Sequence, residues 1–237
     1  MAKPSDINRV EYYHHEQGRL FVVGDLHGCY DALMQELQRV NFNFQQDLLI
    51  AVGDLVDRGA ESLKCLNLTK EPWFKSILGN HEEMCMLGQH DVGIADLHAQ
   101  HGGEWFYTLP LAEQHKVIQQ CQTLPLVLEV QYQGLNYGFV HGDIEHHDWN
   151  TFKAQINDHQ SREIILWGRS RIRNSARKKF DVITGIDYVF LGHTIVDLVT
   201  KRHNCYFIDT GAVFGAQLTV LEIDKNLAIE QQLNLIK

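Results

Sequence analysis

The sequence predicts an α/β protein in which two β-sheets pack face to face with helices on the outside. Two observations lead to this prediction. Up to residue 80, short apolar runs alternate with amphipathic helical patterns, which is typical of parallel strands joined by crossover helices. After Pro125, polar and apolar residues alternate in several short segments, which is typical of antiparallel strands with one solvated face. We expect residues 1–237 to form one domain, because no repeat or linker interrupts them.

The first part of the chain supplies the predicted parallel strands. Apolar runs at 19–25, 47–54 and 74–80 each end in a glycine followed by Asp or Asn, as buried strands do where a loop begins. Between them, residues 30–40 and 60–68 have the apolar spacing of helices. Strands and helices that alternate in this order predict a parallel sheet with right-handed crossovers.

The rest of the chain predicts a helical middle and a further set of strands. Residues 82–124 are expected to be mostly helical, and His90, His98 and His101 within them are expected to be solvated or capping residues. We expect surface loops between residues 87 and 124 and between residues 143 and 167 to help to shape the substrate site. Further strands are expected at 126–133, 135–143, 188–194, 195–203, 205–211 and 217–224.

Charge and cysteine content narrow the class of protein. The net charge of −9 disfavours a surface for nucleic acid, which needs clustered Lys and Arg. No apolar stretch is long enough to cross a membrane, and the N-terminus lacks the apolar core of a signal peptide. Five scattered cysteines without a CxxC pattern favour free thiols in a reducing compartment. We therefore expect a cytoplasmic protein that binds neither nucleic acid nor membrane, and we take it to be a monomer.

Polar side chains gather where the predicted strands end. Each of five strand ends carries an Asp, Asn or His beside a glycine. Because α/β proteins bind ligands beyond the carboxyl ends of their strands, we expect these side chains to lie close together. An Asp-x-His pair in an extended segment would also direct both side chains to one side. The candidate metal ligands are Asp25, His27, Asp54, Asn80, His141 and His193.

These candidates form a mixed oxygen and nitrogen set without a thiolate. Such a set suits Mn²⁺, Fe or Zn²⁺. It is large for one catalytic ion and suits two divalent ions that share a carboxylate. Two such ions with a bridging hydroxide would keep a net positive charge, and the guanidinium of Arg58 beside them suits phosphate oxygens. The sequence therefore predicts metal-assisted hydrolysis of a phosphate ester.

The same motifs resemble a known family. GDLHG at 24–28, GDLVDRG at 53–59 and GNHE at 79–82, followed by a strand-ending histidine and a later GHT, resemble the PPP metallophosphoesterases. Longer phrases such as VVGDLHGCYDAL, LWGRSRI and IDTGAVFG resemble the bacteriophage lambda-type serine/threonine protein phosphatases and their bacterial relatives. The likeness spans roughly residues 19–220. It implies the calcineurin-like metallophosphoesterase fold, a four-layer sandwich of two mixed sheets flanked by helices.

The resemblance implies how the ligands divide between two ions. Asp54 would bridge both of them, and a bridging hydroxide would attack phosphorus in line. Mn²⁺ is usual among bacterial members of the family. The first ion would also take Asp25 and His27, and the second would take Asn80, His141 and His193.

The resemblance also implies the residues that act on substrate. His81 would be the general acid for the leaving oxygen, and Asp57 would orient its imidazole. Arg58 and Arg169 would bind the phosphate oxygens. One position departs from the lambda-type pattern, because an arginine usually precedes GNHE and here the residue is Leu78. Arg171 and Arg173 are the candidates to replace the missing cation, although the charged run 171–179 to which they belong is more typical of a solvated face.

Three functions are compatible with these motifs. The first is a metal-dependent protein serine/threonine phosphatase that hydrolyses phosphomonoesters of proteins or peptides, with phosphotyrosine as a further substrate class. The second is a diadenosine tetraphosphate hydrolase of the same superfamily, for which GNHD rather than GNHE is typical. The third is a non-catalytic metal-binding regulatory module, which fits poorly because it has no use for His81 and Asp57. The sequence favours the protein phosphatase.

Overall fold

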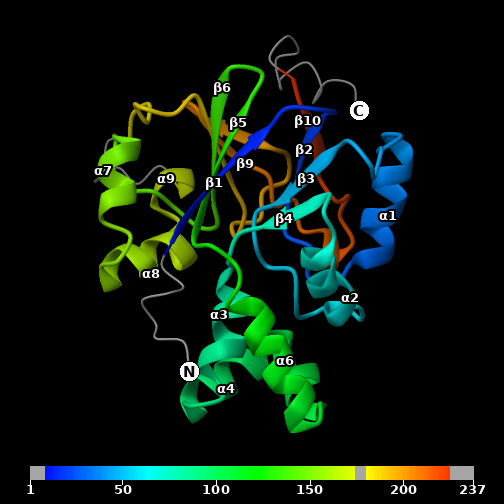
Figure 1. Ribbon diagram of the computed structural model, residues 1–237. Coiled ribbons are helices and arrows are strands. Elements are labelled where there is room, and N and C mark those ends of the chain that lie inside the picture. The colour runs from blue at the N-terminus through cyan, green and yellow to red at the C-terminus, as the bar shows by residue number, and fades with distance from the viewer. Residues whose placement is uncertain (1–8, 174–179, 225–237) are drawn as a thin grey trace.

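Figure 1 shows the computed structural model, which describes residues 9–173 and 180–224. Within these ranges two β-sheets pack face to face, and helices lie against their outer faces. One sheet has the strand order β1-β5-β6-β7-β9-β8, and the other has the order β10-β2-β3-β4. This arrangement confirms the fold class that the sequence predicts. No helix in the described part of the chain is both long enough and apolar enough to cross a membrane.

The smaller sheet contains the predicted parallel unit. β2 (Leu20–Val23), β3 (Leu48–Ala51) and β4 (Phe74–Ser76) are parallel neighbours. They are connected through α1 (Tyr30–Arg39) and through α2 (Ser62–Asn67), which continues as a short 3₁₀ turn. Nearly all residues of these strands are buried, because the sheet is covered on both faces. The last strand, β10 (Val220–Ile223), joins this sheet antiparallel to β2.

The larger sheet is mixed rather than antiparallel throughout. Antiparallel hairpins form between β5 (Val127–Tyr132) and β6 (Leu135–Val140) and between β8 (Thr200–Arg202) and β9 (Cys205–Phe207). β7 (Tyr188–Leu191) runs parallel to both β6 and β9. The expected antiparallel pattern therefore holds for the hairpins only.

The edge strand β1 (Val10–His15) escaped the sequence analysis. It pairs parallel with β5, and its side chains are mostly only partly buried. Its composition of Tyr, His and Glu lacks the apolar run that identifies the central strands.

The inner faces of the two sheets form one apolar layer. Leu20 and Val22 of β2 pack there with Phe139 of β6 and Phe190 of β7. The residues between them face outward to the helices, as the two-residue period of a strand requires. The sheets thereby fix the positions of the strand ends relative to one another.

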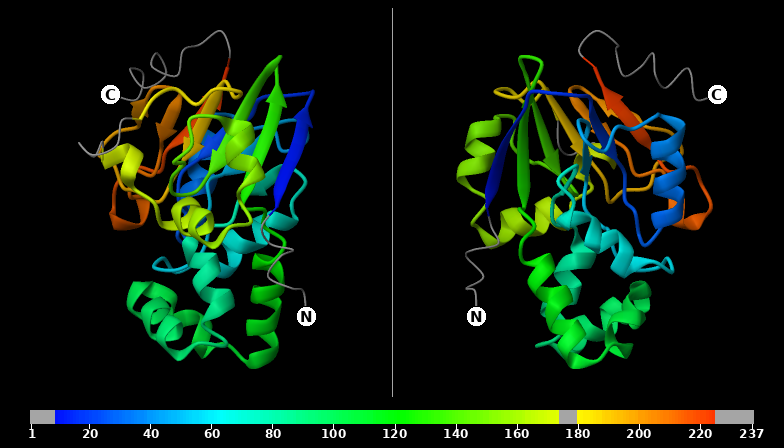
Figure 2. Two further views of the ribbon diagram at one scale, coloured as in Figure 1. Left: turned by 90° about the vertical axis from the view of Figure 1, so that its left-hand side faces the viewer. Right: turned by 45° about the vertical axis from the view of Figure 1, so that its right-hand side comes forward.

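The helical middle of the chain forms an extension at one end of the sheets (Figures 1 and 2). This confirms the helical prediction for residues 82–124. Glycines at 102 and 103 interrupt the helical pattern, and a π-helical turn connects two of the helices there. The extension consists of α3 (Asn80–Leu87), α4 (Val92–His98), the turn Ala99–Gly103, α5 (Glu104–Thr108) and α6 (Leu111–Cys121).

The expectation of surface loops over 143–167 is wrong. This region contains α7 (Trp149–Ala154) and α8 (His159–Trp167), and α9 (Ser170–Arg173) follows. The carboxylates of Asp148 and Asp158 accept hydrogen bonds from backbone N–H groups three residues later and cap the first turns of α7 and α8. These Asp N-caps were a signal for helices that the sequence analysis did not use.

Candidate metal centre

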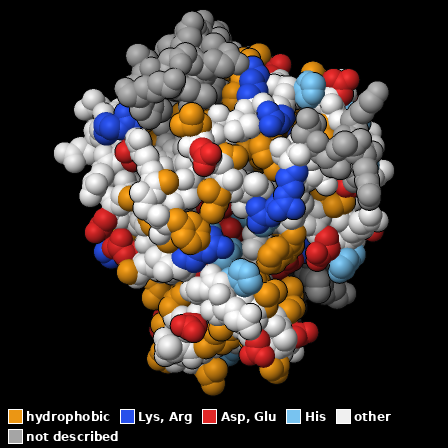
Figure 3. Space-filling view, turned by 180° about the vertical axis from the view of Figure 1, so that it is seen from behind, with side chains coloured by type: hydrophobic (Ala, Val, Ile, Leu, Met, Phe, Trp, Pro, Cys, Tyr) orange, Lys and Arg blue, Asp and Glu red, His pale blue; other side chains and the backbone are white. Residues whose placement is uncertain are grey.

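The candidate site lies where the carboxyl ends of β2, β3, β4, β6 and β7 approach the helical extension (Figures 1 and 2). The two sheets are linked there, since the Nδ1 of His141, at the end of β6, bonds to the carbonyl of Val52, at the end of β3. The backbone N–H of Gly192 donates to the carbonyl of His141 and joins the ends of β7 and β6. On the face drawn in Figure 3, Lys, Arg and His side chains gather just above the extension. The predicted grouping of strand-end residues is therefore present.

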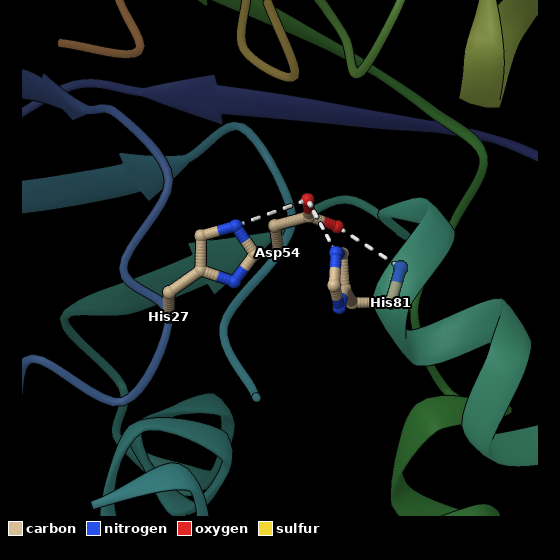
Figure 4. A group of neighbouring side chains, drawn as sticks. All are labelled: His27, Asp54 and His81. Carbon is tan, nitrogen blue, oxygen red and sulfur yellow. Dashed lines mark hydrogen bonds and ion pairs between the residues drawn. The ribbon is translucent and has the colours of Figure 1, made fainter. Parts of the chain in front are cut away.

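Asp54, at the end of β3, stands at the centre of the group. Its Oδ2 lies 3.5 Å from the Nε2 of His27, and its Oδ1 lies 3.3 Å from the Nε2 of His141. Figure 4 shows His27 and His81 on either side of its carboxylate, one from the loop after β2 and the other from α3. Two groups of potential metal ligands share Asp54: His27, Asp54 and His81 form one, and Asp54, His141 and His193 form the other.

The remaining candidates lie around this centre. Asn80, at the start of α3, places its Oδ1 at 2.9 Å from the Nε2 of His141. Asp25 accepts the backbone N–H of His193 at 3.0 Å. The Nε2 of His193 is buried and has no hydrogen-bond partner among the described residues. All six predicted ligands are therefore brought into one buried group.

The imidazoles are prepared to bind a cation. His27 and His141 direct their Nδ1 atoms to the carbonyls of Val56 and Val52, at 2.9 and 2.7 Å, which leaves each Nε2 on the side of Asp54. Burial lowers the pKa of His27 to about 4 and that of His193 to about 2. Neutral imidazoles are what metal ligation requires.

The crowded carboxylates of this group favour the binding of a cation. Burial raises the pKa of Asp25 well above its usual value, and the neighbouring Asp209 and Asp54 add to this effect. For His141, burial opposes protonation, but the carboxylate of Asp54 outweighs burial and raises the pKa. The orphaned Nε2 of His193, the lowered pKa values of His27 and His193 and the crowded carboxylates together fit a site for divalent metal ions.

The backbone at the site is held in an unusual conformation. Five residues of the site have φ between +43° and +75°, a region that residues other than glycine rarely adopt. They are His27, Asp54, Asp57, Arg58 and His193. Such conformations cluster at functional sites, where surrounding contacts maintain them. The segment from Asp25 to His27 is therefore not extended, and the expected i, i+2 geometry is wrong. A turn, rather than strand alternation, brings His27 to the group.

Close packing explains the glycine before Asn80. A Cβ atom on Gly79 would lie 2.2 Å from the Oδ1 of Asp54. The same holds at the end of β7, where a Cβ atom on Gly192 would lie 2.1 Å from the Oδ1 of Asp25. Larger residues at these positions would displace the carboxylates.

A second part of the site surrounds Asp57. Its Oδ2 lies 2.6 Å from the Nδ1 of His81 and 2.8 Å from the Nε2 of His98, and its Oδ1 accepts the indole N–H of Trp105 at 2.7 Å. Burial opposes ionisation of Asp57, but hydrogen bonds from both histidines outweigh it and lower its pKa. Asp57 therefore stays ionised. The expectation that His98 is solvated or a cap is wrong, because His98 is completely buried in this network. His90 and His101 are exposed, as expected.

Two arginines border the group. The guanidinium of Arg58 reaches the Nε2 of His27 and lies 3.0 Å from the Nε2 of His81. Arg169 donates to the carbonyl and the hydroxyl of consecutive residues, His193 and Thr194, both at 3.0 Å. Both predicted phosphate-binding residues therefore lie beside the potential metal ligands.

The missing family arginine is not replaced by Arg171. Leu78 is fully buried in the apolar core. Arg171 is buried too, and its guanidinium donates to the main-chain carbonyls of Ile144, His146 and Asp181. The sequence suggested that Arg171 belongs to a solvated face, and this expectation is wrong. Residues 174–179 of that charged run lie outside the described residues.

Glu82 is a site residue whose role the sequence analysis missed. Its carboxylate accepts the backbone N–H groups of Asp54, Leu55, Val56 and Gly79 at 2.8–3.1 Å. The side chain thus holds the loop after β3 against the start of α3. The signal was the GNHE motif itself, in which Glu three residues after the N-cap position favours a capping box.

Two comparisons of the sequence bear on identity. The profile of the calcineurin-like phosphoesterase family matches residues 18–197. Serine/threonine-protein phosphatase 1 of Salmonella typhimurium is 37% identical over 227 residues, which cover 94% of this chain and 100% of that protein. The symmetrical bis(5'-nucleosyl)-tetraphosphatase of Actinobacillus pleuropneumoniae is 56% identical over 64 residues, but these cover only 26% of this chain and 24% of that protein. The symmetrical bis(5'-nucleosyl)-tetraphosphatase of Aggregatibacter actinomycetemcomitans matches 88% of this chain and 74% of that protein, at 28% identity. Both likenesses therefore span the chain, and the one to the phosphatase has the higher identity over that length.

A comparison of structures agrees in fold. The crystal structure of a cold-active protein-tyrosine phosphatase from a psychrophilic Shewanella matches with a TM-score of 0.64. It covers 95% of this chain and 81% of that chain at 15% identity, so the likeness is one of fold. The family profile covers most of the chain, including every potential metal ligand described above. The chain therefore belongs to the calcineurin-like phosphoesterase family, as its motifs predict.

Proposed function

We propose that this protein is a metal-dependent protein serine/threonine phosphatase that hydrolyses phosphomonoesters, with phosphotyrosine as a secondary substrate class. The observation that carries the proposal is the pairing of Asp57 with His81 directly beside the ligands that share Asp54. A metal-binding module would have no use for a buried carboxylate–imidazole pair at this position. The full-length likeness to a serine/threonine-protein phosphatase supports the substrate class.

The residues would divide between two ions around Asp54. We propose Mn²⁺, although the same oxygen and nitrogen ligands also suit Fe or Zn²⁺. When bound, the ions would activate a water molecule for attack on phosphorus and offset the charge of the phosphate. Asp54 would bridge the ions, with Asp25 and His27 on one and Asn80, His141 and His193 on the other.

The protein's own side chains would supply positioning and proton transfer. His81 would act as the acid in its doubly protonated form, in which Nδ1–H donates to the ionised Asp57 and the Nε2 proton goes to the leaving oxygen. Arg58 and Arg169 would bind the phosphate oxygens, since a guanidinium matches them with paired N–H donors. Phosphorylated protein or peptide would be the substrate.

One observation favours a second candidate, hydrolysis of diadenosine tetraphosphate. A 64-residue stretch is 56% identical to a bis(5'-nucleosyl)-tetraphosphatase, which is higher than the identity to the phosphatase. Against it stands the lower identity of 28–29% where the match to this enzyme class extends over most of the chain, compared with 37% for the phosphatase. Glu82, where the hydrolase class favours Asp, also supports the phosphatase.

The deciding experiment compares substrates at saturating Mn²⁺. We expect kcat/KM to be highest for a phosphoserine peptide, lower for a phosphotyrosine peptide and lowest for diadenosine tetraphosphate. Faster hydrolysis of the dinucleotide would support the second candidate instead. Chelation should abolish activity and added Mn²⁺ should restore it, while undiminished activity of metal-free protein would refute metal dependence.

We also propose a cytoplasmic location for the protein. All five cysteines lie within the described residues, where they are free thiols, and four of them are buried. Such cysteines suit a reducing compartment.

A further inference from the structure

The Asp57 carboxylate has more hydrogen-bond partners than its pairing with His81 requires. The carboxylate accepts hydrogen bonds from His81 of α3, His98 of α4 and Trp105 of α5. His81 and His98 share the same oxygen, Oδ2, at 2.6 and 2.8 Å. The hydrogen bonds of the His98 ring go to Asp57, Tyr107 and Cys85, and none of these is one of the six candidate metal ligands.

The direction of each hydrogen bond follows from the chemistry of the groups. An ionised carboxylate only accepts, so the Nε2 of His98 must carry the proton that it donates to Asp57. The Nδ1 of a neutral His98 is then an acceptor, and the hydroxyl of Tyr107 lies 3.0 Å from it and donates. Tyr107 thereby fixes which nitrogen of His98 faces Asp57.

The backbone is shaped to make room for the His98 ring. A Cβ atom on Gly103 would lie 2.1 Å from two ring atoms of His98. Gly102, in the same π-helical turn, has φ of +96° and accepts the backbone N–H of Arg58 at 3.1 Å. π-helical turns of this kind are frequent at functional sites. The Sγ of Cys85 also lies 3.5 Å from the Nε2 of His98. A residue that only filled the core would not need a polar ring, three polar partners and this turn, since an apolar side chain packs without them.

We propose that His98 is a positioning residue for the general acid, and that it acts by fixing the Asp57 carboxylate. With His98 and Trp105 holding both oxygens, Oδ2 is directed at the Nδ1 of His81, and the Nε2 of His81 is directed at the leaving oxygen. No proton leaves His98 in the reaction. The inference rests on the proposed role of His81, so its test must separate the two.

The test uses a matched pair of variants, His98→Gln and His98→Asn. The amide nitrogen of Gln reaches about as far as Nε2 and can still donate to Asp57, whereas that of Asn reaches only about as far as Nδ1. Each variant is assayed with Mn²⁺ on a phosphoserine peptide, whose alkoxide leaving group needs a proton, and on p-nitrophenyl phosphate, whose leaving group does not.

We expect His98→Asn to lower kcat on the peptide by about 10- to 100-fold, the effect of losing a hydrogen bond to a charged group. The loss on p-nitrophenyl phosphate should be several times smaller, and His98→Gln should recover most of the activity on the peptide. Equal losses on the two substrates, or no recovery by Gln, would mean that His98 only supports the fold and would overturn the inference.

A double-mutant cycle tests the route through Asp57. On an Asp57→Asn background, His98→Asn should cause no further loss of kcat on the peptide, because the group it positions is already removed. A further loss of the same size would overturn the inference. If His98→Asn does not fold, Tyr107→Phe replaces it. That variant should show a smaller loss with the same preference for the peptide, and a loss that is equal on both substrates would count against His98.

The variant His81→Asn separates this inference from the proposed function. If His81→Asn lowers kcat equally on both substrates, the proposed acid is wrong and the inference fails with it. A second outcome is that His81→Asn lowers kcat more on the peptide than on p-nitrophenyl phosphate while His98→Asn lowers both equally. In that case His81 is the general acid, and the proposed role of His98 is refuted.

Discussion

The candidate site joins two regions that differ in how their residues come together. In the metal centre, the side chains come from residues at or just after the ends of strands, and neighbouring strands bring them close together. Around Asp57, the partners come from successive helices of the extension, which the sheets do not position. Residues with positive φ occur in both regions, but only the second is built around one carboxylate that three side chains hold by hydrogen bonds. Variants of the two regions should therefore fail in different ways.

The largest effect is expected in the metal centre. Asp54→Asn removes the carboxylate that both ligand groups share, so metal content should fall and kcat should drop by about 10³-fold. The measurement is metal stoichiometry together with kcat on the phosphoserine peptide. Asp148→Asn, which makes the same chemical change at the N-cap of α7 outside the metal centre and keeps an oxygen for the cap, is the control and should keep both. Full metal content in Asp54→Asn would contradict the shared-ligand arrangement.

A smaller effect, on the free energy of unfolding, is expected at Glu82, which joins the loop after β3 to the start of α3. Glu82→Gln keeps the shape of the side chain but replaces one carboxylate oxygen with an amide nitrogen. Both oxygens of Glu82 accept backbone N–H groups, which an amide nitrogen cannot do. A buried N–H left unpaired should lower the free energy of unfolding by about 2–3 kcal/mol. Urea unfolding checks this, with the exposed Glu163→Gln as a control of unchanged stability. Equal stability of the two variants would show that Glu82 does not hold the loop.

Trp105→Phe tests the helical region alone. It removes the N–H donor to the Oδ1 of Asp57 and keeps an aromatic ring. Because the His81 and His98 bonds to Oδ2 remain, we expect only about a 3- to 10-fold loss of kcat on the peptide, with metal content unchanged. A loss of metal would mean that the two regions are not separable.

The difference between the regions also explains what the sequence could predict. A strand end is marked by an apolar run and a glycine, so the six metal ligands could be found one strand at a time. His98 has no such mark, because its partner Asp57 lies 41 residues away and the π-helical turn that makes room for it follows no simple period. The buried Arg171 was missed for a similar reason, since its partners are main-chain carbonyls that leave no trace in the sequence.

The smallest effect is expected far from both regions, at the start of β3. Asp47 accepts the backbone N–H and the guanidinium of Arg19 at 2.8 and 2.7 Å, and the N–H of Asn43 at 2.8 Å. Burial opposes its ionisation, but these hydrogen bonds outweigh burial and lower the pKa of Asp47. Its carboxylate therefore stabilises the fold above about pH 3.9, the unfolded value, and that stability is lost as pH falls through the lowered folded pKa.

Asp47→Asn should therefore lower the free energy of unfolding at pH 7 by no more than about 1 kcal/mol, because Arg19 is one-third exposed and solvent screens the pair. Urea unfolding at pH 7, 5 and about 3 should show the difference from the unsubstituted protein shrinking only at the acid end. A difference that grows in acid would contradict the sign of the pKa shift. The kcat at pH 7 should stay unchanged, because none of the partners of Asp47 belongs to either region of the site. The contrast with Glu82 then follows from position: both carboxylates accept backbone N–H groups, but only Glu82 holds a loop that carries a metal ligand.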